Sequence, residues 1–337
     1  MDTQHRLDWV DAAKGICIIL VVMFHATLHL TPTLGASGFA WFTHFFGPFR
    51  MPDFFLISGL FLSRRLSAPA AIFYDRKVLH FFYYYWLWVL ITFAILTPGQ
   101  AAGWLPFLSG LATALIYPEG HLWFIYCLPL CFVLARVTRG LLPLGVWIGA
   151  AAAHIFDVQG EPLLLVYLTH YFVFFYTGHV ASPLIFRFAR GVADHPVLAL
   201  LGLGLWAGGN GWITHGSDIA VPGLSLILGV AGGMAITTIA VLLQPIALGS
   251  ALATLGARSI VVYLGFFIPL KYAESLLIPL GLPADVTIAL ALCAGIAVPL
   301  WLYALLKRTG VGLWLFERPA WARPQIARPQ PALDGAS

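Results

Sequence analysis

The sequence predicts an all-α protein that crosses a membrane many times. Hydrophobic residues make up 60% of the 337-residue chain and charged residues only 9%, whereas soluble domains carry about 25% charged residues. Apolar stretches long enough to cross a bilayer as helices recur along most of the chain. The composition therefore excludes a soluble domain and gives no indication of nucleic-acid binding.

Hydropathy predicts about ten spanning helices, at residues 10–31, 38–62, 78–97, 120–137, 141–156, 162–183, 196–214, 222–244, 250–275 and 284–306. The glycine- and proline-containing stretch 98–119 predicts either a helix that lies on the membrane surface or a re-entrant segment, and we favour the surface helix. We divide the chain into a transmembrane domain, 1–308, and a proline-rich tail, 309–337, which we expect to be disordered.

Basic residues predict the orientation of these spans. They gather in alternate connections, and the intervening connections carry acidic residues instead. Cytoplasmic loops of membrane proteins are enriched in Lys and Arg. Both termini are therefore predicted to be cytoplasmic. The basic residues of the predicted cytoplasmic connections are Arg64, Arg65, Arg76, Lys77, Arg136, Arg139, Arg187, Arg190, Arg258, Lys307 and Arg308.

Lys14 and His25 are the first polar residues of note. They are separated by eleven positions, almost three helical turns, so they share one helix face roughly 16 Å apart along the axis. Lys14 falls near the start of the first span, where it reaches water. His25 falls well inside it, and an ionisable group at membrane depth is a functional-site candidate by default.

Arg50 is the second such residue, near the middle of the span at 38–62. Asp53 follows three positions later on the same helix face, so the two residues form either a self-neutralising pair or a fixed charge beside an aqueous site. Pro48 and Pro52 flank Arg50 and predict a break in the helix. Because broken helices at membrane depth line aqueous sites, we favour the second interpretation.

The sequence gives weaker evidence of a functional role for His121, Glu119 and His29. His121 opens a predicted span beside aromatic residues typical of a membrane interface, and Glu119 is either a group that orients a substrate hydroxyl or a solvated helix end. His25 and His29 are one turn apart, but without a third ligand we predict no metal site.

At these residues the sequence resembles the acyltransferase-3 family of integral membrane acyltransferases. The resemblance covers residues 7–308 and rests on four passages: RLDWVDAAKGICIILVVMFH, FRMPDFFLISGLFLSRR, GHLWFIYCLPL and LGARSIVVYLGFFIPLK. The first passage carries the family's Arg/Lys-x10-His arrangement, filled here by Lys14 and His25. The fourth departs from the family pattern, because Phe266 stands where many members have a histidine.

The resemblance implies transfer of an acyl group, usually acetyl, from acyl-CoA to a hydroxyl of an envelope or secreted carbohydrate. The chain looks most like the short members grouped with sugar O-acetylases, which carry no appended soluble domain. Such enzymes act in the bacterial inner membrane with acyl-CoA as co-substrate and no bound cofactor. Neither the acceptor sugar nor the oligomeric state follows from the sequence.

The implied site roles leave alternatives open. His25 acts as general base or carries the acyl group itself, and Arg50 stabilises the oxyanion or steers the acceptor. Lys14, Arg64 and Arg65 bind the phosphates of acyl-CoA, or the two arginines only set topology. Asp53, Glu119 and His121 are further candidates for substrate contact. A transporter or flippase of a glycan or lipid-linked saccharide is the alternative function.

Overall fold

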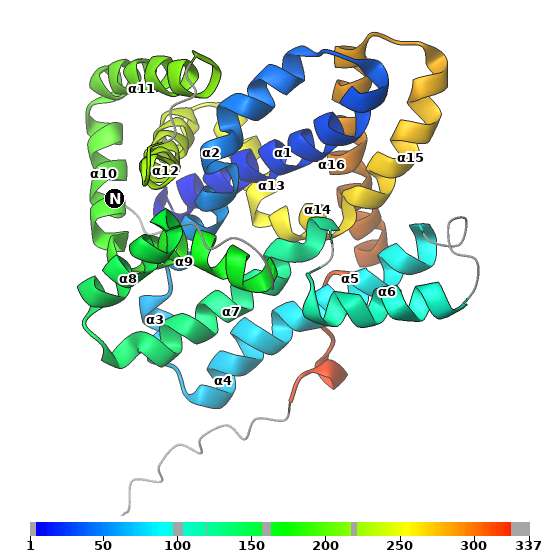
Figure 1. Ribbon diagram of the computed structural model, residues 1–337, viewed down its shortest axis with the longest axis horizontal. Helices are drawn as coiled ribbons and strands as arrows, with labels where there is room; N and C mark the ends of the chain where they lie inside the picture. The colour runs from blue at the N-terminus through cyan, green and yellow to red at the C-terminus, as the bar shows by residue number, and fades with distance from the viewer. Residues whose placement is uncertain (1–4, 97–103, 119, 157–162, 217–220, 325–337) are drawn as a thin grey trace, which may run out of the picture.

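The computed structural model describes residues 5–96, 104–118, 120–156, 163–216 and 221–324. Every regular element in these residues is a helix, which confirms the all-α prediction (Figure 1). The main helices are α1 (His5–Leu34), α2 (Gly38–Gly59), α3 (Ser63–Leu66), α4 (Ala70–Tyr74), α5 (His80–Leu96), α6 (Trp104–Ile116), α7 (Trp123–Val137), α8 (Pro143–Ile155), α9 (Leu163–Val180), α10 (Ser182–Asp194), α11 (Pro196–Gly216), α12 (Leu224–Leu243), α13 (Ala247–Ala257), α14 (Ser259–Gly265), α15 (Phe267–Leu277) and α16 (Ala284–Thr309). Short helical turns, described below where they matter, connect several of them.

Helix α1 passes through the centre of the molecule and contacts α2, α12, α13 and α16 (Figure 1). Its closest neighbour is α13, because Gly15 on α1 and Gly256 on α13 let the two backbones touch. A Cβ atom at either position would overlap the facing main chain. Small residues at such contacts are the usual way in which membrane helices approach closely. This packing holds the buried face of α1, and His25 with it, against the other central helices.

Seven helices among the described residues are long and apolar enough to cross a membrane, and the bent pair α13–α14 makes an eighth if it forms one span. Helix length and hydropathy therefore support fewer spans than the predicted ten. Two predicted spans account for the difference. Helix α8 has only 13 residues. Helix α2 is long enough, with 22 residues, but Arg50 and Asp53 lower its mean hydropathy. It nevertheless packs against the spanning helices α1, α9 and α12.

The helix breaks in the structure are not where the sequence predicts them. Helix α2 runs without interruption from Gly38 to Gly59, with both prolines inside it, so the break predicted at Pro48 and Pro52 is wrong. The predicted span 250–275 is instead divided into α13, α14 and α15. The axes of α13 and α14 differ by 60° at Arg258, and Phe266 separates α14 from α15.

The chain after α16 folds back onto α5, and we call residues 313–323 the C-terminal strap. Side chains of α5 donate hydrogen bonds to its carbonyl groups: Tyr83 to Trp314, Tyr84 to Phe316 and Trp88 to Leu315. This part of the tail is ordered, in contrast to the predicted disorder. Residues 325–337 lie outside the described residues.

Arg318 fixes the strap to the start of α5. Its side chain is only 5% exposed and forms an ion pair of 2.8 Å with Asp75. Asp75 opens a π-helical turn, Asp75–Leu79, that leads into α5. π-Helical turns are rare in proteins, and those that do occur are often found at functional sites. The strap therefore anchors the turn that carries Arg76 and Lys77.

Candidate functional site

His25 lies in a cluster of aromatic rings contributed by α1 and the α14–α15 junction. Its ring centroid is 5.2 Å from Phe24, 5.1 Å from Phe266 and 6.3 Å from His29. The Nδ1 atom of His25 is buried and has no hydrogen-bond partner in the described part of the chain. Buried polar atoms are nearly always paired, so an unpaired imidazole nitrogen makes His25 a candidate functional residue.

His121 reaches the same aromatic cluster from the turn Gly120–Leu122, before α7. It is 4% exposed, stacks on Phe267 at 4.2 Å and lies edge-on to Phe266 at 5.4 Å. Its carbonyl accepts a 2.6 Å hydrogen bond from the Tyr263 hydroxyl, which fixes the turn to α14. Its Nε2 atom is buried and, within the described residues, has no partner. His121 is therefore a buried group that shares the aromatic cluster with His25.

Phe266 is fully buried between the two histidines. It occupies the break between α14 and α15, which turns its ring toward α1. The residue that departs from the family pattern thus contacts both His25 and His121 directly. An aromatic ring here supplies packing and no proton-transfer group.

Arg50 points toward α1 and not toward Asp53. Its guanidinium carbon lies 3.7 Å from the centre of the Phe24 ring, and its Nη1 atom is buried with no partner among the described residues. The interaction with Phe24 is a cation–π contact. Arg50 and His25 therefore meet at Phe24, whose ring contacts both side chains.

Asp53 is buried on a different side of α2. It is 1% exposed, lies against Gly233 of α12 and is within electrostatic range of the Cys17 thiol. In the described chain neither of its carboxyl oxygens has a hydrogen-bond partner, and no ion pair joins it to Arg50. The interpretation of the two residues as a self-neutralising pair is therefore wrong.

A second polar group lies one turn along α1 from His25. The ammonium group of Lys271, on α15, is 3.1 Å from Nδ1 of His29 and 2.9 Å from a carboxylate oxygen of Glu274. Because an ammonium group only donates, Nδ1 of His29 accepts, and the proton of the neutral ring is on Nε2. Lys271 and Glu274 form an ion pair within α15, and the link of this pair to His29 is not visible in the sequence.

A group of basic residues lies at the other end of α1. Lys14 forms a 2.8 Å ion pair with Asp11. Lys77, from the π-helical turn, is within electrostatic range of Lys14 and Arg65, and its ammonium group lies 4.6 Å from the centre of the Phe132 ring. We call Lys14, Arg65 and Lys77 the basic end. The side chain of Arg64 and the whole of Glu119 lie outside the described residues.

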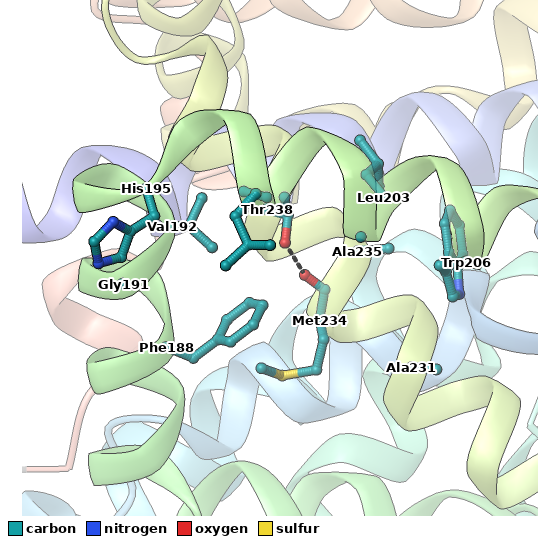
Figure 2. A pocket seen from close by; sticks show the side chains of 13 residues that line it. Phe188, Gly191, Val192, His195, Leu203, Trp206, Ala231, Met234, Ala235 and Thr238 are labelled. Carbon is teal, nitrogen blue, oxygen red and sulfur yellow. Dashed lines mark hydrogen bonds between the residues drawn. The ribbon is translucent and has the colours of Figure 1, made fainter.

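The structure also contains a groove that none of the predicted site residues lines. Its volume is about 510 Å³, and α10, α11 and α12 form its walls (Figure 2). Apolar side chains such as Phe188, Leu203 and Met234 dominate its lining. Within the described chain no three His, Cys, Asp or Glu side chains gather in a metal-binding arrangement.

Comparison with known proteins identifies a family model that spans the helical region and one relative that matches part of it. A family model described as an acyltransferase domain matches residues 7–306. The inner membrane protein YcfT of Escherichia coli (strain K12) is 30% identical over 170 residues, which cover 40% of this chain and 45% of the E. coli protein. The match thus spans less than half the length of that relative. No solved structure matches the chain.

Proposed function

The chain belongs to the acyltransferase-3 family, whose model matches residues 7–306, and we propose that this acyltransferase moves an acyl group from acyl-CoA to a hydroxyl of a carbohydrate. Its acyl group is acetyl, and its acceptor is an envelope or secreted glycan. The relative YcfT is an inner membrane protein, which supports the bacterial inner membrane as the place of action. The basic loops support cytoplasmic termini.

One observation carries the proposal: His25 and Arg50 come from different helices and meet at Phe24, each with a buried, unpaired nitrogen. Leaving such groups unpaired costs about 1–3 kcal/mol each, more for a charged group. A purely structural protein gains nothing by leaving these groups unpaired, whereas the carbonyl and hydroxyl groups of reacting substrates would form hydrogen bonds with both nitrogens.

In the proposed reaction His25 is the general base. Neutral imidazole takes the proton of the acceptor hydroxyl as that oxygen attacks the thioester carbonyl. The new C–O bond forms, the C–S bond breaks, and the thiolate leaves to be protonated as CoA. The Arg50 guanidinium stabilises the negative charge that develops on the carbonyl oxygen. His121, on the other side of Phe266, contacts the acceptor.

The basic end supplies the donor side of the reaction. Lys14 and His25 lie on one face of α1, separated by roughly 16 Å along the helix axis. The arm that joins the phosphates of acyl-CoA to its thioester is of comparable length. Lys14, Arg65 and Lys77 bring three positive charges together, and Asp11 pairs with one of them. Positive groups of this kind bind phosphates well.

The acceptor enters from the opposite end, past His29, Lys271 and Glu274. This group offers both donors and acceptors, which suits the hydroxyl groups of a sugar. Asp53 lies against Gly233 of α12, so we assign it no contact with the acceptor.

The deciding experiment is an assay of the protein purified in detergent. With acetyl-CoA and a mixture of envelope saccharides, release of free CoA should depend on the saccharide, and mass spectrometry should show acceptors heavier by one acetyl group. A transporter or flippase would release no CoA, and that result would overturn the proposal. Trapping of an acyl group on His25 after acid quenching would assign it the carrier role instead of the general-base role.

A further inference from the structure

A serine and a histidine outside the His25 site form a hydrogen-bonded pair. His154, near the end of α8, is 3% exposed. Its Nε2 atom lies 2.8 Å from Oγ of Ser225, the second residue of α12. Its Nδ1 atom lies 2.7 Å from the carbonyl oxygen of His170 on α9. Three helices therefore meet at one buried imidazole.

The hydrogen bonds fix which tautomer the neutral imidazole adopts. A carbonyl oxygen only accepts, so Nδ1 of His154 carries the proton and donates to His170. In the neutral ring Nε2 is then the acceptor, and the Ser225 hydroxyl donates to it. A serine is activated as a nucleophile when its hydroxyl is hydrogen-bonded to a base and a third group orients that base.

The backbone around Ser225 suits attack on a carbonyl group. Gly223 has φ +81° and directs the chain into α12. Ser225 therefore lies in the first helical turn, where main-chain N–H groups have no intrahelical acceptor. The N–H groups of Ser225 and Leu226 are the neighbouring main-chain donors for the oxyanion that forms on the carbonyl oxygen of the substrate when Oγ attacks. The Ser225 side chain is exposed, so a substrate can reach it.

This pair is separate from the His25 site. His170 and Phe174 of α9 face α8 and α12, where both rings contact His154. Tyr171 faces α2 and α7 instead, where it stacks on Phe55, contacts Trp123 and lies within electrostatic range of Arg50. The His154 pair and Arg50 thus lie on different sides of α9.

We propose that Ser225 is a second nucleophile, which accepts an acyl group from a carboxylic ester or thioester. Its Oγ forms a bond to the acyl carbon, the bond from that carbon to the leaving oxygen or sulfur breaks, and the hydroxyl proton passes to Nε2 of His154. His154 returns this proton to the leaving group. Water or an alcohol then removes the acyl group by the reverse sequence. This activity does not depend on the proposed function of the His25 site.

The chain offers a matched control for this pair. Ser63 Oγ lies 3.1 Å from Nδ1 of His179, and Ser63 is exposed, as Ser225 is. The two pairs differ at Nδ1 of the histidine. Nδ1 of His154 contacts a carbonyl group, which fixes the tautomer of the ring, whereas Nδ1 of His179 contacts the serine itself. Ser63 should therefore be unreactive under conditions in which Ser225 reacts.

The test uses the full-length protein in detergent and a fluorophosphonate probe, which reacts with activated serines. Mass spectrometry of the wild type should place the adduct on Ser225. Labelling should be lost in Ser225→Ala, fall at least tenfold in His154→Gln and be unchanged in Ser63→Ala. Absence of an adduct on the wild type, or an adduct that persists in Ser225→Ala, would overturn the proposal.

The wild-type adduct needs no variant, so the outcome stands even if a substitution prevents folding. Acetylation of Ser225 by p-nitrophenyl acetate, seen as one added acetyl group on its peptide, is the second readout. Labelled Ser225 without saccharide-dependent CoA release would support this inference and contradict the proposed function. CoA release without reactive Ser225 would do the opposite.

Discussion

The guanidinium group of Arg50 lies 3.7 Å from the centre of the Phe24 ring and is not paired with Asp53. A cation held by an aromatic face keeps its hydrogen-bond donors free, whereas a carboxylate would occupy them. The contact therefore positions a positive charge beside His25 without neutralising it.

Replacement of Arg50 by Lys tests this arrangement. Lys keeps the charge but lacks the planar fork and stacks less well on Phe24. We expect kcat to fall by about 10²–10³-fold, the effect of removing one oxyanion donor, with an unchanged amount of protein in the membrane. Arg187→Lys on α10 is the control and should keep wild-type kcat. An Arg50→Lys enzyme with normal kcat would make Arg50 structural.

His25→Ala should reduce acyl transfer by at least about 10²–10⁴-fold, the usual contribution of a general base. Membrane abundance should remain unchanged, because His25 makes no hydrogen bond through Nδ1 that its loss would break. His44→Ala, at an exposed histidine on α2, is the matched control and should remain active. Saccharide-dependent CoA release measures both. Normal transfer by His25→Ala would remove it from the mechanism.

The basic end should govern the affinity for acyl-CoA. Arg65→Gln and Lys77→Met should each raise the KM for acetyl-CoA about tenfold and leave kcat unchanged, because phosphate contacts are the same in substrate and transition state. The KM of the wild type should also rise with salt concentration. Arg64→Gln, combined with Arg65→Gln, should weaken binding further. Tagging of the termini checks that topology is kept; unaltered KM values would assign these residues to topology alone.

Lys271 should act on the acceptor through His29. Lys271→Met removes the donor that holds the Nε2–H tautomer of His29, so the KM for the saccharide should rise about tenfold, equivalent to about 1.4 kcal/mol. The KM for acetyl-CoA should not change. Arg308→Met, at an exposed residue of α16, is the control. A rise in the KM for acetyl-CoA instead would place Lys271 on the donor side.

Arg318 should contribute strongly to stability. Arg318→Met leaves the Asp75 carboxylate without its ion-pair partner, which costs about 3–5 kcal/mol for a buried pair. The thermal unfolding temperature in detergent should fall markedly. The double variant Arg318→Met/Asp75→Asn should recover part of the loss, because it leaves no unpaired charge. Equal loss in the single and double variants would show that the ion pair itself contributes little.

The sequence predicts the helices and singles out His25 and Arg50 as candidates, because a charge at membrane depth is costly wherever it occurs. It does not predict the partners of these residues. Asp53 lies three positions after Arg50, and the nearest carboxylate was the natural partner to expect. The Arg50 side chain instead extends to Phe24 on another helix, a contact that local spacing does not encode.

The break at Phe266 was equally hidden. The segment YLGFF is uniformly apolar and predicts a continuous span, so no local signal marks the end of α14. Proline in the tail predicted disorder, whereas Arg318 finds its partners 243 positions away, at Asp75. Contacts at such separations follow from the packing of the whole bundle and not from the composition of a segment.

The C-terminal strap links the folding of α5 to the completion of the chain. Tyr83, Tyr84 and Trp88 are among the first third of residues to leave the ribosome, but their hydrogen-bond acceptors at residues 314–316 are among the last. Asp75 likewise gains its ion-pair partner only after Arg318 has been synthesised. The turn that carries Lys77 therefore reaches its final form only after α16 has been inserted. A chain interrupted before residue 313 would possess every residue of the His25 site but would lack the residues that anchor the turn carrying Lys77.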